Sequence, residues 1–295
     1  MNSRLAVIVL VFSSMGWGLT WLPLKYLTET GMSSLQLILI AFTSGALVFS
    51  PWLFKQYAYW KTSIGLMLMI ALAGGIANAS FQTAIAHGDV IRVMILFYLL
   101  PVWSVLGGRI FLKEKVSKVR LVAVMLSLAG AAVILDVVNT SWQGISWIDV
   151  LAIVSGMGLA ATNILFRYTQ NIPAMSKVAV MFAGCALLIA VSLQFTGESQ
   201  SLPGNQSIML AALYGVVWLG LITYGTQWAV TQMEAGRSSI IIVMELVVAV
   251  VSSALILGSD LGVNEIVGGL MVLSAAIIEG VRYEDSEQQR ETLPE

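Results

Sequence analysis

The sequence predicts an all-α membrane protein whose ten transmembrane helices form two inverted five-helix repeats around a central cavity. Composition is the first observation, because the 295 residues are 58% hydrophobic and only 11% charged. Soluble domains carry roughly 25% charged residues, so this chain falls outside that class. The second observation is that ten apolar runs fill the chain, and the third is that the last five repeat the pattern of the first five.

Each run is close to the ~20 residues that an α-helix needs to cross the hydrocarbon core of a bilayer. The connections between the runs are short and leave no room for a soluble domain. The first run follows Arg4, as in a signal peptide, but it continues to Leu24 without a small-residue cleavage site. We therefore expect a retained helix. In order, the runs span residues 5–26, 33–54, 63–86, 91–112, 118–138, 147–167, 174–196, 207–232, 237–257 and 263–281.

An internal repeat becomes visible when the sequence is shifted on itself by 145 positions. Five spans is an odd number, so the second copy must enter the membrane from the opposite side. Inverted repeats place a substrate site at their interface and allow alternating access. We expect one repeat over residues 1–140, a second over 141–282, and a polar, disordered cytoplasmic tail over 283–295. The aligned pairs include Gln82 with Gln227, Ala84 with Ala229, Arg92 with Arg237, Leu112 with Leu257 and, at an offset of 142, Met15 with Met157 and Thr20 with Thr162.

Positive charges indicate the orientation of the chain, because Lys and Arg accumulate on the cytoplasmic side of membrane proteins. The predicted spans place 13 of the 15 Lys and Arg residues on the side of both termini, and only Lys25 and Arg92 on the other side. Both termini are therefore expected in the cytoplasm, and the same split supports a count of ten spans. The 13 residues are Arg4, Lys55, Lys61, Arg109, Lys113, Lys115, Lys118, Arg120, Arg167, Lys177, Arg237, Arg282 and Arg290.

The sequence lacks the motifs that several functional classes require. Residues 156–161 match the dinucleotide-binding pattern G-x-G-x-x-A, but they lie inside an apolar run without the strand, turn and helix that this mechanism needs. Small residues for close helix packing explain them better. No P-loop, nucleophile–base pair or His/Cys/carboxylate cluster is present, so we expect no enzyme activity, no cofactor and no metal. The single cysteine, Cys185, excludes an intramolecular disulfide, and we expect no nucleic-acid partner.

Polar and aromatic side chains inside the apolar runs are the candidate substrate-binding residues. Polar groups in lipid need partners or water, so they usually face the interior of the bundle. Several share one helix face at spacings of three and four residues, and the repeat carries them into the second half. Each face could instead join two helices, but four faces in equivalent positions favour a shared central cavity. The candidates are Trp17, Thr20, Trp21, Asn78, Phe81, Gln82, Tyr98, Thr162, Asn163, Tyr224, Gln227, Trp228 and Glu245.

Glu245 is the only acidic residue far inside an apolar run. At ~1.5 Å per residue it lies roughly 13 Å into the ninth run, close to the centre of a ~30 Å core. It could be neutral and hydrogen-bonded, paired with a cation, or exposed to a cavity where it meets a substrate ammonium group. The second fate lacks a Lys or Arg at that depth, and the repeat geometry favours the third. Pro23 and Pro101 interrupt the first and fourth runs, where we expect kinks that could act as hinges.

Two motifs of the first repeat and one residue of the second point to a known family. They are Phe97-Tyr98-Leu99-Leu100-Pro101-Val102, Phe111-Leu112-Lys113-Glu114-Lys115 and Glu245 in the ninth run. On these residues the chain resembles the drug/metabolite transporter superfamily, in its EamA-type ten-helix, two-repeat branch, and the likeness covers essentially all of its residues. The sequence departs from the family pattern at Leu246, where a proline usually stands, and at Gly258-Ser259-Asp260, the second acidic position. These differences leave the expected fold intact and weaken any transfer of a coupling mechanism.

More narrowly, the chain resembles the YddG-type amino-acid exporters of bacterial inner membranes. This resemblance implies export of aromatic amino acids and related compounds from the cytoplasm, and the deep aromatic residues are compatible with a substrate that gains from ring stacking. We expect an amino-acid substrate, the lipid bilayer as partner and a monomeric state. Two alternatives are a multidrug or metabolite transporter of the same superfamily, and a membrane receptor or scaffold that binds without translocating. Proton-coupled and facilitated transport both stay open.

Overall fold

The computed structural model describes residues 3–29, 31–140, 144–196, 204–258 and 260–291, and every regular element within these ranges is helical. Nine helical segments in the described residues are long and apolar enough to cross a membrane. The segments are α1 (Ser3–Gly18) with α2 (Trp21–Thr28), α3 (Ser34–Lys55), α4 (Tyr57–Trp60) with the short η1 (Lys61–Ser63) and α5 (Ile64–His87), α6 (Val90–Phe97) with α7 (Leu100–Phe111), α9 (Trp147–Tyr168), α10 (Ala174–Thr196), α11 (Asn205–Leu213) with the π-helical η2 (Tyr214–Leu219) and α12 (Gly220–Gln232), α13 (Ala235–Ile242) with α14 (Met244–Leu257), and α15 (Val263–Glu291).

The fifth predicted run, 118–138, corresponds to α8 (Lys118–Ile134), which is shorter than predicted. With 17 residues it is not among the nine segments, so a tenth membrane helix stays a prediction. α8 lies against α15, and the two helices meet at Gly130 and Gly268. A Cβ atom on either glycine would lie closer than 3.0 Å to the other glycine's carbonyl oxygen, so this pairing requires residues without a side chain.

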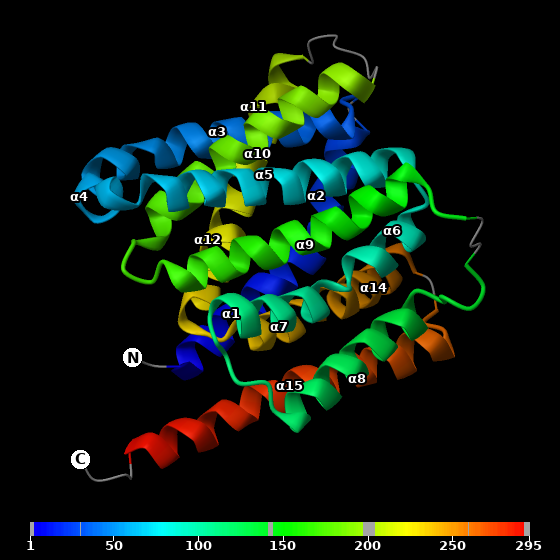
Figure 1. The fold of residues 1–295 in the computed structure, drawn as a ribbon. Helices are drawn as coiled ribbons and strands as arrows, with labels where there is room; N and C mark the ends of the chain where they lie inside the picture. The colour runs from blue at the N-terminus through cyan, green and yellow to red at the C-terminus, as the bar shows by residue number, and fades with distance from the viewer. Residues whose placement is uncertain (1–2, 30, 141–143, 197–203, 259, 292–295) are drawn as a thin grey trace.

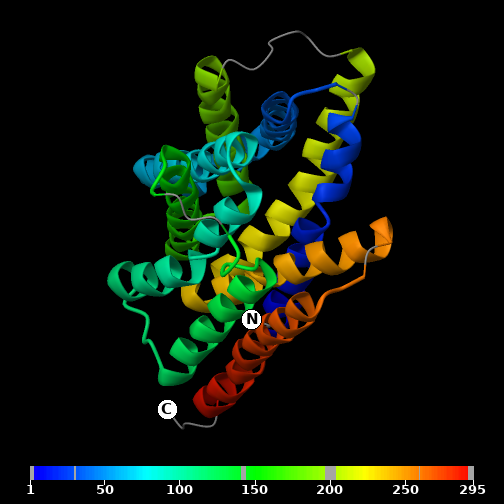
Figure 2. The ribbon, with the colours of Figure 1, turned by 90° about the vertical axis from the view of Figure 1, so that its right-hand side faces the viewer.

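The helices form two groups on opposite edges of the bundle (Figures 1 and 2). α3, α5 and α10 lie along one edge, where α10 packs against both of the others, and α8 and α15 lie side by side along the opposite edge. Between them, α9 packs against α5, and α1 packs against α12 and α14. The two chain ends lie at the same end of the bundle as α4 (Figure 1). We call this the terminal end.

Side-chain caps mark the first residues of α3, α6, α8 and α9. Ser33 and Ser146 each form a reciprocal capping box, in which the serine accepts from a backbone N–H and the third helical residue bonds back. Asp89 accepts from the Arg92 amide at the start of α6, and Ser117 accepts from an amide at the start of α8. Caps of this kind contribute about 1 kcal/mol each, because they satisfy amides that have no partner inside the helix.

The largest buried cluster lies between α3 and α10. Phe182 of α10 is fully buried and contacts two rings of α3 edge-on, Phe42 with a centroid distance of 5.0 Å and Phe49 with 5.8 Å. Edge-to-face geometry of this type adds to the dispersion energy of burial. The cluster joins the second helix of each predicted repeat, and it therefore fixes one half of the molecule to the other.

The structure corrects the prediction of a disordered tail over residues 283–295, because α15 continues as a helix to Glu291. Residues 292–295 lie outside the described residues. The physical reason is local sequence: the segment is rich in Glu, Gln and Arg, which are good helix formers, and its first helix breaker is Pro294. High charge predicted disorder, but an existing helix needs no new nucleus to continue.

Candidate functional site

Several of the membrane-spanning segments are interrupted inside the apolar region. α1 and α2 are separated at residues 19–20, α6 and α7 at 98–99, and α13 and α14 at Val243, while 214–219 form a π-helical turn. Tyr98 and Val243 are 145 positions apart, which is the offset of the sequence repeat. The fourth helix of each half is therefore broken at the same place. Unwound backbone at membrane depth is tolerated where it is covered by protein or lines a water-filled cavity, and transporters use it to bind substrates.

The predicted proline kinks at Pro23 and Pro101 coincide with two of these interruptions. Pro23 is the third residue of α2, and Pro101 is the second residue of α7. Proline is tolerated in the first turn of a helix, because its missing N–H would have no partner there. The break at Val243 has no proline nearby, so another cause is required.

The break in the fourth helix of each half is covered by a closely packed helix from the other half of the chain. Gly18, at the end of α1, lies so close to the break in the ninth span that a Cβ atom would come within 3.0 Å of the Glu245 carbonyl oxygen. A Cβ atom on Gly156 of α9 would likewise come within 3.0 Å of the Phe97 carbonyl oxygen at the other break. The first helix of each half therefore packs on the broken helix of the other half.

Tyr98 and Glu245 connect the two breaks directly. The Tyr98 hydroxyl donates a hydrogen bond of 3.2 Å to Glu245 Oε1. Glu245 is the second residue of α14, so its carboxylate lies at a helix N-terminus, where the helix dipole is favourable to negative charge. Phe97 contacts Tyr98 at 5.3 Å and Phe81 at 4.7 Å between ring centroids. The structure thus brings three predicted site residues, from α5, α6–α7 and α14, into one cluster.

Three tryptophan indoles join the interrupted first span to the second half of the chain. Each indole N–H donates to a hydroxyl oxygen of a residue about 200 positions away in sequence. Trp17, Thr20 and Trp21 are predicted site residues, but their partners Thr226, Trp218 and Ser252 are not among the predicted set. No local pattern identifies those partners, because the contacts depend on how distant helices pack. The bonds are Trp17 to Thr226 at 3.1 Å, Trp218 to Thr20 at 3.2 Å and Trp21 to Ser252 at 3.0 Å.

A buried amide pair forms a second polar group. Gln227 Nε2 of α12 donates to Asn163 Oδ1 of α9 at 3.3 Å, and both side chains are at most 3% exposed. Asn163 Nδ2 and Gln227 Oε1 have no partner among the described residues, so the pair presents one free donor and one free acceptor. Thr162, by contrast, is satisfied by its bond to the Gly158 carbonyl at 2.8 Å. Leu159, one turn earlier on α9, packs against the buried cluster that contains Tyr98, so α9 contributes to both polar groups.

The remaining predicted residues occupy two other places. Asn78 of α5 donates to the Gly74 carbonyl at 3.0 Å, and Gln82 lies one turn further along the same helix, half-buried. Tyr224 and Trp228 line a groove of about 490 Å³ between α1 and α12, together with the exposed side chains of Phe12 and other apolar residues. The structure does not bring these two aromatic residues into the Tyr98–Glu245 cluster. Among the described residues, no group of three His, Cys, Asp or Glu side chains could hold a metal ion.

The sequence of this chain matches the model of a known protein family in two regions. The model of the EamA-like transporter family matches residues 4–136 and again residues 146–279. The chain belongs to the EamA-like transporter family. It is a multi-pass membrane protein of that family. Each of the two matched regions contains interrupted helices and polar side chains in the interior.

Two individual comparisons agree with this EamA-like assignment. An uncharacterized transporter of Clostridium kluyveri is 23% identical over 270 residues, which cover 86% of each chain. A solved crystal structure superposes with a TM-score of 0.72 at 14% identity, and covers 92% of this chain and 94% of the other. At that identity the superposition shows a shared fold and nothing about the substrate.

Proposed function

We propose that this EamA-like protein exports amino acids, with a preference for aromatic and other apolar ones, by alternating access. The observation that carries the proposal is the Tyr98–Glu245 hydrogen bond between two helix breaks in repeat-equivalent positions. Broken helices facing each other across the centre of a bundle form the usual substrate site of secondary transporters. A carboxylate at that point is costly unless it has a polar or charged partner, and a substrate ammonium group supplies one.

The surrounding chemistry suits a zwitterion with an apolar side chain. Glu245 would accept from the ammonium group, and the free donor Asn163 Nδ2 would bind the carboxylate, with Gln227 holding its partner amide in place. Phe81 and Phe97 supply rings for the apolar side chain, because Phe97 contacts both Phe81 and Tyr98, the hydrogen-bond partner of Glu245. A zwitterion loses its hydration when it enters such a site, so it needs several polar partners at once.

The proposal includes ten spans, with α8 as the fifth, and two inverted halves over residues 1–140 and 141–282. Both termini lie at one end, which requires an even number of spans (Figure 1), and the family model matches the chain twice. Packing is exchanged between the halves: α1 packs on α12 while α9 packs on α5. The excess of positive residues at the terminal end favours a cytoplasmic location for it, in a monomer of the bacterial inner membrane.

Counterflow in liposomes tests the function most directly. Purified protein would be reconstituted with one unlabelled amino acid inside, and uptake of the labelled form would be followed for each of the twenty amino acids. We expect the largest uptake for Phe, Trp, Tyr and the apolar aliphatic residues. Uptake that is no greater than in protein-free liposomes for all twenty would refute amino-acid transport.

A multidrug or metabolite transporter of the same superfamily is the second candidate, because an aromatic cluster around a carboxylate also suits a lipophilic cation. Competition separates the two, since excess lipophilic cation should leave labelled Phe uptake unchanged in an amino-acid exporter. A receptor or scaffold would bind without accumulation inside liposomes that contain only this protein.

The amide residues provide a further test. Gln227→Ala removes the donor to Asn163, and Gln82→Ala removes the second predicted amide. Each single variant should raise the half-saturation concentration for Phe by roughly tenfold, which corresponds to the loss of one buried hydrogen bond. Gln170→Ala removes an exposed amide and serves as the control. If both site variants transport Phe and Trp at wild-type affinity while expression holds, the amides have no role in binding.

A further inference from the structure

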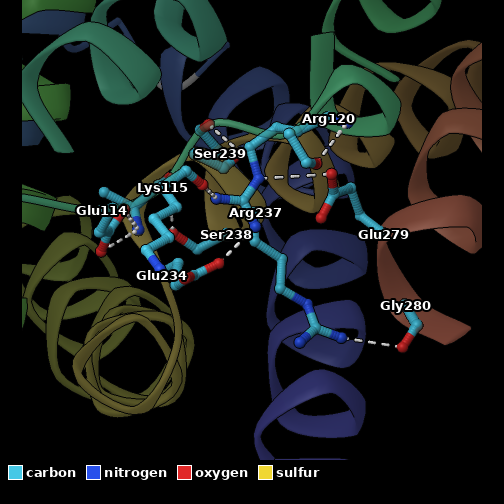
Figure 3. A network of polar contacts seen from close by, with 12 residues as sticks. Glu114, Lys115, Arg120, Glu234, Arg237, Ser238, Ser239, Glu279 and Gly280 are labelled. Atoms are coloured by element: carbon cyan, nitrogen blue, oxygen red, sulfur yellow. Dashed lines mark hydrogen bonds and ion pairs between the residues drawn. The ribbon is translucent and has the colours of Figure 1, made fainter. Parts of the chain in front are cut away.

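A network of charges joins the two halves at the terminal end (Figure 3). Arg120, near the start of α8, pairs through Nη2 with the Glu234 carboxylate and lies 3.5 Å from Glu279 of α15 through Nε. The Arg120 side chain is only 9% exposed and that of Glu279 only 2%, so these charges depend on protein partners rather than water. Arg120 belongs to the first half and both carboxylates to the second, and the pairs therefore cross between the halves.

Glu114 makes a second connection across the same boundary. Its two carboxylate oxygens accept from the Ala235 backbone amide at 3.2 and 3.1 Å. Ala235 is the first residue of α13, so a side chain of the first half caps a helix of the second half. Burial raises the pKa of the Glu114 carboxyl above its usual value, and the bond from the Ala235 amide and the charges of Arg167 and Arg120 offset only part of this rise. The cap position of α13 itself is Glu234, whose side chain makes no capping bond and pairs with Arg120 instead.

The repeat-equivalent positions at the opposite end are built differently. Asp89 is the equivalent of Glu234 at an offset of 145, and it caps its own helix α6 by accepting from the Arg92 amide at 2.9 Å. Glu265 is the equivalent of Arg120, so the cation of the first copy is replaced by an anion. Two acidic side chains cannot pair with each other, and α6 keeps its cap without help from the other half.

An ion pair also joins the halves at the opposite end. Arg92 of α6 contacts Asp149 of α9 at 2.6 Å through Nε and 2.5 Å through Nη2, and Nη2 also donates to the Gly144 carbonyl. This pair joins the fourth span to the sixth. At this end no side chain of one half caps a helix of the other half among these residues. Asp89 caps α6 and Ser146 caps α9, each at the start of its own helix.

We propose that Glu114, Arg120 and Glu234 form a latch that holds the terminal end closed and must separate when that end opens. The proposal rests on alternating access as part of the proposed function, and names the residues that control one of its two states. Separation would remove the cap of α13 and the partners of Arg120 together, so the closed state gains charge-assisted hydrogen bonds that the open state lacks.

Electron–electron distance measurements between spin labels test the latch without a substrate. Labels at Ile110 of α7 and Gln170 after α9 report the terminal end, and labels at Tyr26 and Leu257 report the opposite end, all on exposed positions in a Cys185→Ala background. The variant Arg120→Gln should increase the long-distance population at the terminal end about tenfold relative to the parent, as expected for the loss of a charge-assisted bond. Glu114→Ala and Glu234→Gln should act in the same direction.

Arg109→Gln is the matched control, because it makes the same charge change on an exposed residue at the same end, and should leave the distances unchanged. If Arg120→Gln does not fold, Glu114→Ala carries the test, since it removes the shared cap and keeps the ion pair between Arg120 and Glu234. Parent-like distances in the folded latch variants would overturn the latch, even if amino-acid transport is established. A shift in these distances would support the latch even if counterflow shows that the substrate is not an amino acid.

Discussion

Gly184→Ala is expected to prevent the protein from reaching a stable folded state. A Cβ atom on Gly184 of α10 would lie closer than 3.0 Å to the Ala71 carbonyl oxygen of α5, and backbone cannot move aside as a flexible side chain can. Gly215 of η2 has the same relation to the Ala41 carbonyl oxygen of α3. Overpacking a well-packed contact costs about 1–3 kcal/mol or more, and here the two helices would have to separate.

Size-exclusion chromatography of detergent extracts and a thermal melt would measure this effect. Gly184→Ala and Gly215→Ala should each give little monodisperse protein, or a large drop in melting temperature. Gly65→Ala, in α5, is the matched control, because no atom lies within 4 Å of the added Cβ. This control should be neutral or stabilising by about 0.5–1 kcal/mol, since alanine is a better helix former than glycine. Equal yields and melting temperatures for Gly184→Ala and Gly65→Ala would contradict the close approach of the helices.

Loss of transport in Glu245→Gln is the second large effect that we expect. Glutamine keeps the size of the side chain and can still accept from the Tyr98 hydroxyl, so only the charge is removed. If the carboxylate binds the substrate ammonium group, counterflow of Phe should fall at least tenfold, because a charged hydrogen bond contributes about 1.5–3 kcal/mol. Initial rates in liposomes from pH 5 to 8 would measure the effect.

Two further variants make the result specific. Tyr98→Phe removes the hydrogen bond and keeps the charge, so transport should fall less than in Glu245→Gln. Glu29→Gln makes the same chemical change on an exposed residue and should transport like the wild type. Wild-type rates for Glu245→Gln across the whole pH range would leave Glu245 as a structural residue that only joins α14 to Tyr98.

Several parts of this fold follow from local sequence. Apolar runs of about 20 residues predict membrane helices from length and composition alone, and nine of the ten runs match helical segments able to cross a membrane. The fifth run was predicted too long, because α8 ends at Ile134, where a turn follows. Prolines predicted the interruptions before Pro23 and Pro101, since a proline in the first turn of a helix marks where that helix begins.

The sequence by itself predicted polar side chains inside the bundle, because lipid excludes unpaired polar groups, and Tyr98, Asn163 and Gln227 are buried. Only the tertiary structure decided their partners. The break at Val243 occurs without a proline, where Gly18 from the other half packs on the backbone. Glu114 caps α13 across 121 positions of sequence, and Trp17 bonds to Thr226 across 209. Contacts of this kind depend on how distant helices pack, and no spacing within a single helix encodes them.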